Sequence, residues 1–149
     1  MIYYFAYGSN MDAKRMTERV VDFEIIGQGI LEDFELKFNK INQKKKGVGY
    51  ANVSTEHGKK VEGIIYRFEN ISLLDKPEGY PKHYDRKIME IVYNSGRLKA
   101  WVYIANENRI SEGLLPERDY LAHLLTGKDY LSKAYIDELY KQKVIEDKI

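Results

Sequence analysis

Hydrophobic and polar residues alternate along the chain in a pattern that predicts a β-rich middle with helices near both ends. Residues 2–7 form an aromatic and apolar run, typical of a buried strand, that stops at the turn-forming residues 8–10. Residues 11–20 are mostly helix-forming, and Asp12 falls in the first turn, where a carboxylate interacts favourably with the helix dipole. The N-terminal part therefore predicts a strand, a turn and a short helix.

The middle of the chain predicts antiparallel strands. From residue 25 to residue 39, apolar side chains recur at a period of mostly two, which indicates one long strand, or two strands kinked near Gly27 and Gly29. Two hairpins follow, the first with a turn at His57 and Gly58 and the second with a turn at residues 94–96. Their strands are expected at residues 50–53, 61–68, 88–93 and 98–105.

A short helix is expected between the two hairpins. Residues 70–79 contain two possible N-caps, Asn70 and Ser72, and two residues that break helices, Pro77 and Gly79.

The C-terminal part predicts two more helices. Leucine, isoleucine and tyrosine side chains recur at helical spacing within residues 120–125 and 136–140, and Gly127 can end the first helix. No linker or repeat divides the sequence. The expected fold is therefore a single α+β domain over residues 1–149, with a β core and helices at its ends.

Composition narrows the possible functions. With 24 basic and 23 acidic side chains the net charge is +1, which provides no strong field for nucleic acid or anionic lipid and favours a small-molecule partner. The absence of cysteine removes thiol nucleophiles and thiolate metal ligands, and it fits a reducing compartment such as the cytoplasm. We expect neither a signal peptide nor a membrane segment, because no stretch approaches about 20 apolar residues.

The most suggestive segment for chemistry is the turn after the first strand. A strand that ends in small polar residues and leads into a helix directs backbone N–H groups at one point, where they can bind a carboxylate or an oxyanion. Gly8 allows a ligand to approach the backbone because it has no Cβ. The alternative is an ordinary turn in which Asn10 caps the helix.

A second candidate is Glu78, which lies just after the short helix among aromatic residues. Burial of a glutamate disfavours its charged form and raises its pKa, which suits a general base and acid. The alternative is a surface glutamate in a turn.

Other chemistries have less support in the sequence. The histidines at 57, 83 and 123 are isolated, so we expect no metal site. Ser9 lacks the G-x-S-x-G setting of a hydrolase nucleophile, and residues 126–128 match only a fragment of a phosphate-binding loop. The basic run at residues 44–46 could hold phosphate, but a solvated loop is the better interpretation.

Four segments together resemble the γ-glutamylcyclotransferase-like family, in residue types, order and spacing. They are YFAYGSN at residues 4–10, VEGIIY at 61–66, LLDKPEG at 73–79 and HYDRK at 83–87. The resemblance extends from residue 3 to about residue 140. It implies a small β-barrel-like sheet flanked by helices, and a reaction that releases 5-oxoproline from γ-glutamyl compounds without a cofactor.

The resemblance also assigns roles to particular residues. It places the substrate-binding loop at Tyr7, Gly8, Ser9 and Asn10, and the essential carboxylate at Glu78. The resemblance also matches two ligand-facing tyrosines of the family to Tyr84 and Tyr120, and Tyr80 is a nearby competitor for the position of Tyr84. A glycine–alanine pair of the family appears here as Gly127 and Lys128, a departure expected at the pocket rim.

The residues fit the implied chemistry. The α-amino group of a γ-glutamyl amide can attack its own side-chain carbonyl, so the enzyme needs no nucleophile but does need a proton carrier and anion donors. The alternative is a non-catalytic module that binds a γ-glutamyl or other small carboxylate ligand. The leaving amine and the oligomeric state stay open at this stage.

Overall fold

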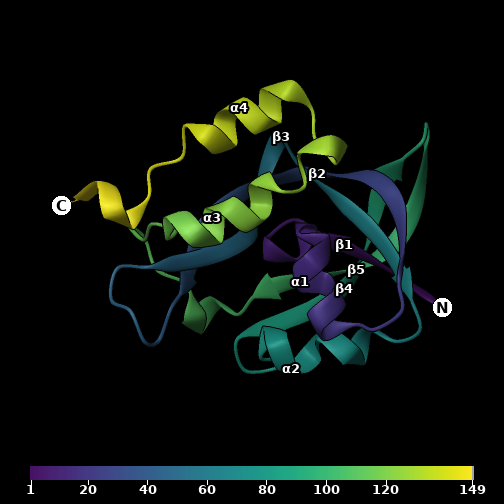
Figure 1. Ribbon diagram of the computed structural model, residues 1–149, viewed down its shortest axis with the longest axis horizontal. Helices are drawn as coiled ribbons and strands as arrows, with labels where there is room; N and C mark the ends of the chain where they lie inside the picture. Colours follow the sequence, from purple (N-terminus) through teal and green to yellow (C-terminus); the bar gives the residue numbers. More distant parts are fainter. Residues whose placement is uncertain (149) are drawn as a thin grey trace.

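In the computed structural model, which describes residues 1–148, the strands close into a barrel that helices cover on its outside (Figure 1). The strand order around the barrel is β1-β3-β2-β4-β5. This is the expected α+β fold with a small barrel-like sheet. The strands are β1 (Ile2–Ala6), β2 (Glu24–Ile41), β3 (Gly49–Phe68), β4 (Tyr84–Tyr93) and β5 (Gly96–Ala105). The α-helices are α1 (Ala13–Arg19), α2 (Asp75–Glu78), α3 (Arg118–Leu125) and α4 (Lys133–Tyr140). Short 3-10 helices are η1 (Ser9–Met11), η2 (Ile71–Leu74), η3 (Glu107–Arg109), η4 (Lys128–Tyr130) and η5 (Ile145–Lys148).

The two longest strands, β2 and β3, form one antiparallel pair along most of their length. The predicted turn at His57 and Gly58 is wrong, because residues on both sides of it pair with the same strand β2. The chain bulges outward instead: Gly58 has a φ of +83° and its N–H donates to the Asp33 carboxylate. A run of exposed polar residues is a turn signal in sequence, but here it marks a bulge inside a strand.

The second predicted hairpin, β4 and β5, is confirmed. Tyr93 pairs with Gly96, and the two residues between them, Asn94 and Ser95, have φ angles of 47° and 67°. Positive φ at both central positions is the requirement of the two-residue turns that match strand twist. β4 begins at Tyr84, four residues before the predicted start at residue 88, and this extension brings Tyr84 to the candidate site.

The first strand closes the barrel. β1 pairs with β3 in antiparallel fashion from Ile2↔Phe68 to Ala6↔Ile64, and it meets β5 in parallel at Tyr4↔Trp101. Phe5 and Ala6 are fully buried. Because β1 has neighbours on both sides, the turn after Ala6 is held at one end of the barrel, where the helices begin.

The helix after the first strand starts later than the sequence suggests. Residues Ser9–Met11 form the 3-10 helix η1, and Asp12 is the N-cap of α1, accepting a hydrogen bond from the Lys14 N–H at 3.1 Å. The alternative in which Asn10 caps the helix is therefore wrong. The Asn10 side chain points inward and is 2% exposed.

The segment that carries Glu78 is η2 followed by α2. Of the two cap candidates, the Asn70 side chain accepts from the Ser72 N–H, and Gly79 ends α2 in the left-handed conformation with φ +68°. Pro77 does not break the helix, since it lies within the first turn, where a missing N–H is tolerated. A Cβ at Gly79 would also lie 2.8 Å from the His83 ring.

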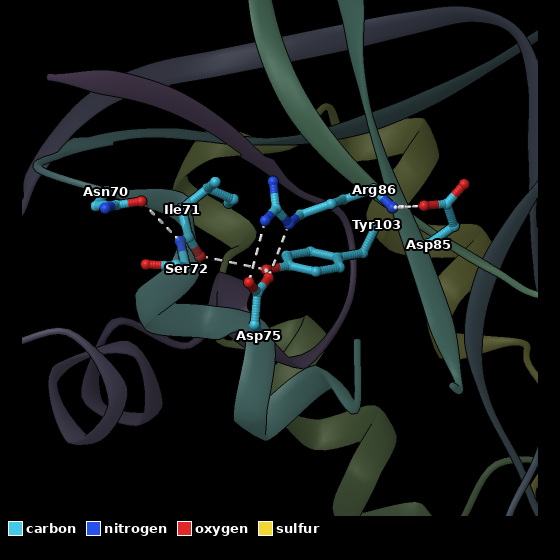
Figure 2. A network of polar contacts seen from close by, with 7 residues as sticks. All are labelled: Asn70, Ile71, Ser72, Asp75, Asp85, Arg86 and Tyr103. Atoms are coloured by element: carbon cyan, nitrogen blue, oxygen red, sulfur yellow. Dashed lines mark hydrogen bonds and ion pairs between the residues drawn. The ribbon is translucent and has the colours of Figure 1, made fainter. Parts of the chain in front are cut away.

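An ionic network fixes this segment to the barrel (Figure 2). Arg86 from β4 makes two hydrogen bonds to Asp75, at 2.8 and 3.1 Å, and the Tyr103 hydroxyl from β5 donates to the same carboxylate at 2.8 Å. The Arg86 guanidinium carbon also lies 4.3 Å from the ring centre of Tyr80 and 4.8 Å from that of Trp101. Asp75 lies three residues before Glu78, so this network sets the position of the candidate catalytic carboxylate.

The two predicted C-terminal helices are confirmed as α3 and α4, which lie side by side in Figure 1. α3 also packs against η1. The buried carboxylate of Glu62 on β3 accepts hydrogen bonds from the Ser132 N–H and hydroxyl at 2.7 Å, and thereby holds the start of α4. Within residues 1–148, no helix has the length and apolarity needed to cross a bilayer.

Candidate active site

Two adjoining cavities lie where the turn after β1, the segment of Glu78 and helix α3 meet. The larger, which we call the outer chamber, has a volume of about 460 Å³, and the smaller, the inner recess, about 30 Å³. They share the lining residues Ser9, Glu78, Tyr84 and Tyr120. The inner recess is large enough for a carboxylate or one to two water molecules, whereas the outer chamber has the volume of a small-molecule site.

All seven residues predicted for the site line the inner recess. They are Tyr7, Gly8, Ser9, Asn10, Glu78, Tyr84 and Tyr120. They come from four separate parts of the chain, so their convergence is a property of the fold and not of local sequence.

The turn after β1 forms one wall of the recess. Its backbone hydrogen bonds run from the Met11 N–H to the Gly8 carbonyl and from the Asp12 N–H to the Ser9 carbonyl. These bonds use the amides of residues 11 and 12, and the first amides of a 3-10 helix have no acceptor within the helix. Gly8 has negative φ, so its role is space: a Cβ there would lie 3.2 Å from the Ala51 Cβ and 3.5 Å from the Tyr120 hydroxyl.

Glu78 lies between the two cavities. It is half-buried, since it faces both of them, and not the exposed glutamate of the alternative interpretation. Burial raises the pKa of Glu78 above the usual value of a glutamate, and nearby cations, Arg19 first among them, limit this rise. A carboxyl group with a raised pKa is a better proton acceptor than an ordinary glutamate.

The side chain of Asn10 contacts the carboxylate of Glu78. Its amide Nδ2 lies 3.4 Å from Glu78 Oε1 and donates to the Tyr4 hydroxyl at 3.0 Å. Arg19 donates to the Asn10 Oδ1 at 2.9 Å, and the Tyr66 hydroxyl donates to the Asn10 carbonyl at 2.6 Å. These bonds fix the side chain so that one N–H of Nδ2 is directed at Tyr4 and the other at Glu78, a role that the sequence pattern did not reveal.

Of the five tyrosines that line the recess, the three predicted for the site are Tyr7, Tyr84 and Tyr120, and they stay neutral. Burial raises the pKa of Tyr7 and Tyr84 well above the ordinary range and that of Tyr120 to about 12, and the Glu78 charge adds to each rise. The hydroxyl groups of Tyr7 and Tyr84 donate hydrogen bonds to backbone carbonyls. Tyr120 accepts from the Ala51 N–H at 3.1 Å, so its own proton can be donated to a ligand. Tyr80 lines neither cavity.

Apart from Lys44, which belongs to the basic run at residues 44–46, the cations of the outer chamber were not predicted from the sequence. Arg15 and Arg19 come from α1, Lys40 from the end of β2, and Lys44 and Lys76 from flanking segments. Spacing along the chain carries no signal for this group, because it forms only when β2 passes beside α1 and α2.

One expected position is not at the site. Gly127 is buried against Met11 and Ile64, and neither Gly127 nor Lys128 lines either cavity, so the expectation that they touch the pocket rim is wrong. His83 lines the outer chamber, and burial lowers its pKa. Within residues 1–148, no group of three or more histidine and carboxylate side chains is arranged to hold a metal ion.

Comparisons with known proteins agree on fold and family. A family model described as "Gamma-glutamyl cyclotransferase, AIG2-like" matches residues 4–122. A solved structure titled "Gamma-glutamyl cyclotransferase" superposes with a TM-score of 0.85 at 23% identity, covering 96% of this chain and 88% of that one. The uncharacterized protein loc79017 from Homo sapiens gives the same TM-score and coverage at 24% identity.

A third similar structure is longer. YkqA from Bacillus subtilis superposes with a TM-score of 0.79 at 25% identity, covering 94% of this chain and 53% of its own. This chain thus corresponds to about half of YkqA. Among curated protein sequences, none matches significantly.

Proposed function

The chain belongs to the γ-glutamyl cyclotransferase, AIG2-like family, and on that basis we propose that it cyclises a γ-glutamyl amide to 5-oxoproline with Glu78 as the proton carrier. The observation that carries the proposal is the position of one carboxyl group: Glu78, with a raised pKa, faces the recess lined by the turn after β1 and lies 3.4 Å from Asn10. A base that borders an anion-sized recess is what this cyclisation requires.

The sizes of the cavities suggest how the substrate lies. The inner recess accommodates a carboxylate but not a whole glutamyl group, so the α-carboxylate enters the recess beside the amides of Gly8 and Ser9. The α-nitrogen and the side-chain carbonyl then lie near Glu78, where the two cavities meet. The leaving amine extends into the outer chamber.

The reaction then needs one new bond and one broken bond. Glu78 takes a proton from the α-ammonium, and the freed nitrogen attacks the side-chain carbonyl carbon to close a five-membered ring. Glu78 passes this proton to the leaving nitrogen, takes the second proton from the ring nitrogen, and the C–N bond breaks. The second proton goes to the released amine, so the products are 5-oxoproline and an ammonium ion.

The neutral tyrosines and backbone amides complete the site. The carbonyl oxygen becomes negative in the tetrahedral intermediate, and donors already in place stabilise that charge without reorganisation. Of Tyr7, Tyr84 and Tyr120, only Tyr120 does not donate its proton to a backbone carbonyl among the described residues, so it can serve this purpose. Because its pKa is about 12, it stays protonated at neutral pH.

The test is a screen of γ-glutamyl amino acids and γ-glutamyl amines for release of 5-oxoproline, measured by chromatography, with Glu78→Gln as control. The wild-type protein is expected to form the lactam, and the variant to lose activity by about 10²- to 10⁴-fold while it still binds the substrate. Wild-type rates from the variant would rule out this role for Glu78. Thermal stabilisation by the substrates without any product would instead indicate a binding module.

A further inference from the structure

Positive charge is concentrated around the outer chamber, although the whole chain carries a net charge of only +1. One carboxylate lines the chamber, that of Glu78, which the reaction itself uses. Five basic side chains line it: Arg15, Arg19, Lys40, Lys44 and Lys76.

These cations lack acidic partners. In the described part of the chain, none of the five has a carboxylate within 4.0 Å, whereas Lys45, which does not line the chamber, pairs with Glu117 at 2.7 Å. Arg15 also has a buried Nε without a hydrogen-bond partner among the described residues. A cavity with unpaired cations has a positive potential that is focused by its low-dielectric walls.

Lys40 is the most informative of the five because it is only 4% exposed. Its Nζ donates to the Ile41 carbonyl at 2.8 Å and lies 5.6 Å and 5.8 Å from the ring centres of Tyr50 and Tyr84. Both rings line the outer chamber. An ammonium has three N–H donors, so this arrangement leaves donors for a further acceptor. A buried lysine is costly unless an anion pairs with it.

Given the proposed function, on which this inference rests, we propose that the outer chamber selects γ-glutamyl substrates whose leaving amine carries two carboxylates. The leaving group is then an acidic amino acid or an acidic peptide, linked through its α-nitrogen. Lys40 binds the carboxylate nearest to the scissile bond, and the more exposed rim residues, Lys44 among them, attract the second. A leaving amine that carries further positive charges, such as a polyamine, is repelled by the same chamber.

Three matched substrates test the charge requirement: γ-glutamylglutamate, γ-glutamylglutamine and γ-glutamylglutamine amide. Their leaving groups are close in size and carry two, one and no carboxylates. We expect kcat/KM to fall by about tenfold or more when the carboxylate near Lys40 is removed, the effect of a charged hydrogen bond. The second carboxylate is expected to contribute up to about fivefold, the effect of an exposed ion pair. Equal kcat/KM for the three substrates would overturn the proposal.

Lysine variants assign the two effects. Lys40→Met is expected to lower kcat/KM for γ-glutamylglutamine by about tenfold more than for the amide, whereas Lys40→Arg retains the preference. Lys44→Met reduces only the advantage of the second carboxylate. The matched control is Lys46→Met, an exposed residue of the same loop that lines neither cavity. If Lys40→Met lowers all three values equally, the residue is structural and the proposal is wrong.

A binding measurement separates this inference from the proposed reaction. In Glu78→Gln, dissociation constants by calorimetry should follow the same order of the three substrates, and adding Lys40→Met should remove the difference between γ-glutamylglutamine and its amide. Ordered binding together with no lactam from the wild-type protein would reject the reaction and keep the charge selection. Lactam formation, together with dissociation constants and kcat/KM values that do not follow the number of carboxylates, would support the reaction and reject the charge selection.

Discussion

The side-chain amide of Asn10 approaches Glu78 to 3.4 Å while its oxygen accepts from Arg19 at 2.9 Å. Arg19 therefore acts on the Glu78 carboxylate through Asn10 as well as by its own charge, which lowers the Glu78 pKa against the effect of burial. The Asn10 Oδ1 is held by Arg19, so the amide is oriented with its NH2 group, and not its oxygen, toward Glu78.

Asn10→Ala is expected to raise the pKa of Glu78 further, because a hydrogen bond to the charged carboxylate is lost. The acid limb of the pH profile of kcat/KM would then move to higher pH. Loss of the buried partner of Tyr4 and Arg19 should also lower the free energy of unfolding by about 1–3 kcal/mol. The control is Asn52→Ala, because Asn52 is equally buried but bonds to Asn39 and Ala105. A pH profile that moves equally in both variants would contradict the role of Asn10.

Glu78→Gln is expected to stabilise the fold at neutral pH. The raised pKa means that the folded state binds a proton more readily than the unfolded state, so the wild-type protein loses stability as the pH rises from about 4.5 through the folded-state pKa of Glu78. Glutamine removes that loss. Thermal unfolding of both proteins at pH 4 and pH 7.5 measures it, with a gain of roughly 2–4 °C for each kcal/mol. A gain in Tm that is larger at pH 4 would show that the sign is wrong.

Gly8→Ala is expected to impair catalysis more than stability. The added Cβ would lie 3.2 Å from the Ala51 Cβ and 3.5 Å from the Tyr120 hydroxyl, and it would intrude on the recess. The Gly8 φ of −114° imposes no left-handed strain, so the fold should tolerate alanine. We expect kcat/KM to fall about tenfold or more, since catalysis is sensitive to a displacement of about 1 Å.

Gly63→Ala serves as the contrast, because its Cβ would meet the Ala6 carbonyl oxygen inside the barrel. This variant should lose 1–3 kcal/mol or more, by order of magnitude, in thermal or urea unfolding. If Gly8→Ala lost only stability and kept its kcat/KM, the turn after β1 would be merely structural.

Asp75→Ala is expected to reduce both stability and kcat, although Asp75 lines neither cavity. It leaves Arg86 and the Tyr103 hydroxyl without their shared acceptor and loosens the segment that ends in Glu78 (Figure 2). The expected loss in the free energy of unfolding is about 1–3 kcal/mol.

The matched comparison is Glu32→Ala, which removes the exposed ion pair with Arg97 and should cost no more than about 1 kcal/mol. The measurement is urea unfolding together with kcat and KM. A Glu32 variant as unstable as the Asp75 variant would show that the network in Figure 2 contributes no more to the free energy of unfolding than an exposed ion pair.

Much of the fold could be predicted because local patterns agreed with tertiary structure. The turn at Asn94 and Ser95, with its following glycine, is a strong local signal and gave the correct hairpin. The segment at His57 and Gly58 carries similar residues, yet it bulges and does not reverse, because β2 is long enough to pair with both sides of it. The length of a partner strand is not visible in the sequence of the segment itself.

Some residues of the site could likewise be predicted from local sequence signals, and others could not. The turn after β1 and Glu78 have local signals, a strand end rich in small residues and a carboxylate at the end of a short helix, and both face the inner recess. Lys40 had no such signal, since it lies in an ordinary strand pattern and gains meaning only from the side chains around it. The run at residues 44–46 is a loop, as expected, but its members differ: Lys44 lines the chamber and Lys45 pairs with Glu117.

The loop at residues 42–48, which joins β2 to β3, borders the outer chamber but contributes nothing to the inner recess. This loop adds Lys44 to the chamber separately from Glu78 and the turn after β1, whereas Lys40 lies in β2 and Lys76 lies two residues from Glu78. Exchanging this loop for one of different charge is a route to new substrate preference with the cyclising apparatus left in place. Such modularity would let related proteins diversify by changes in one connection.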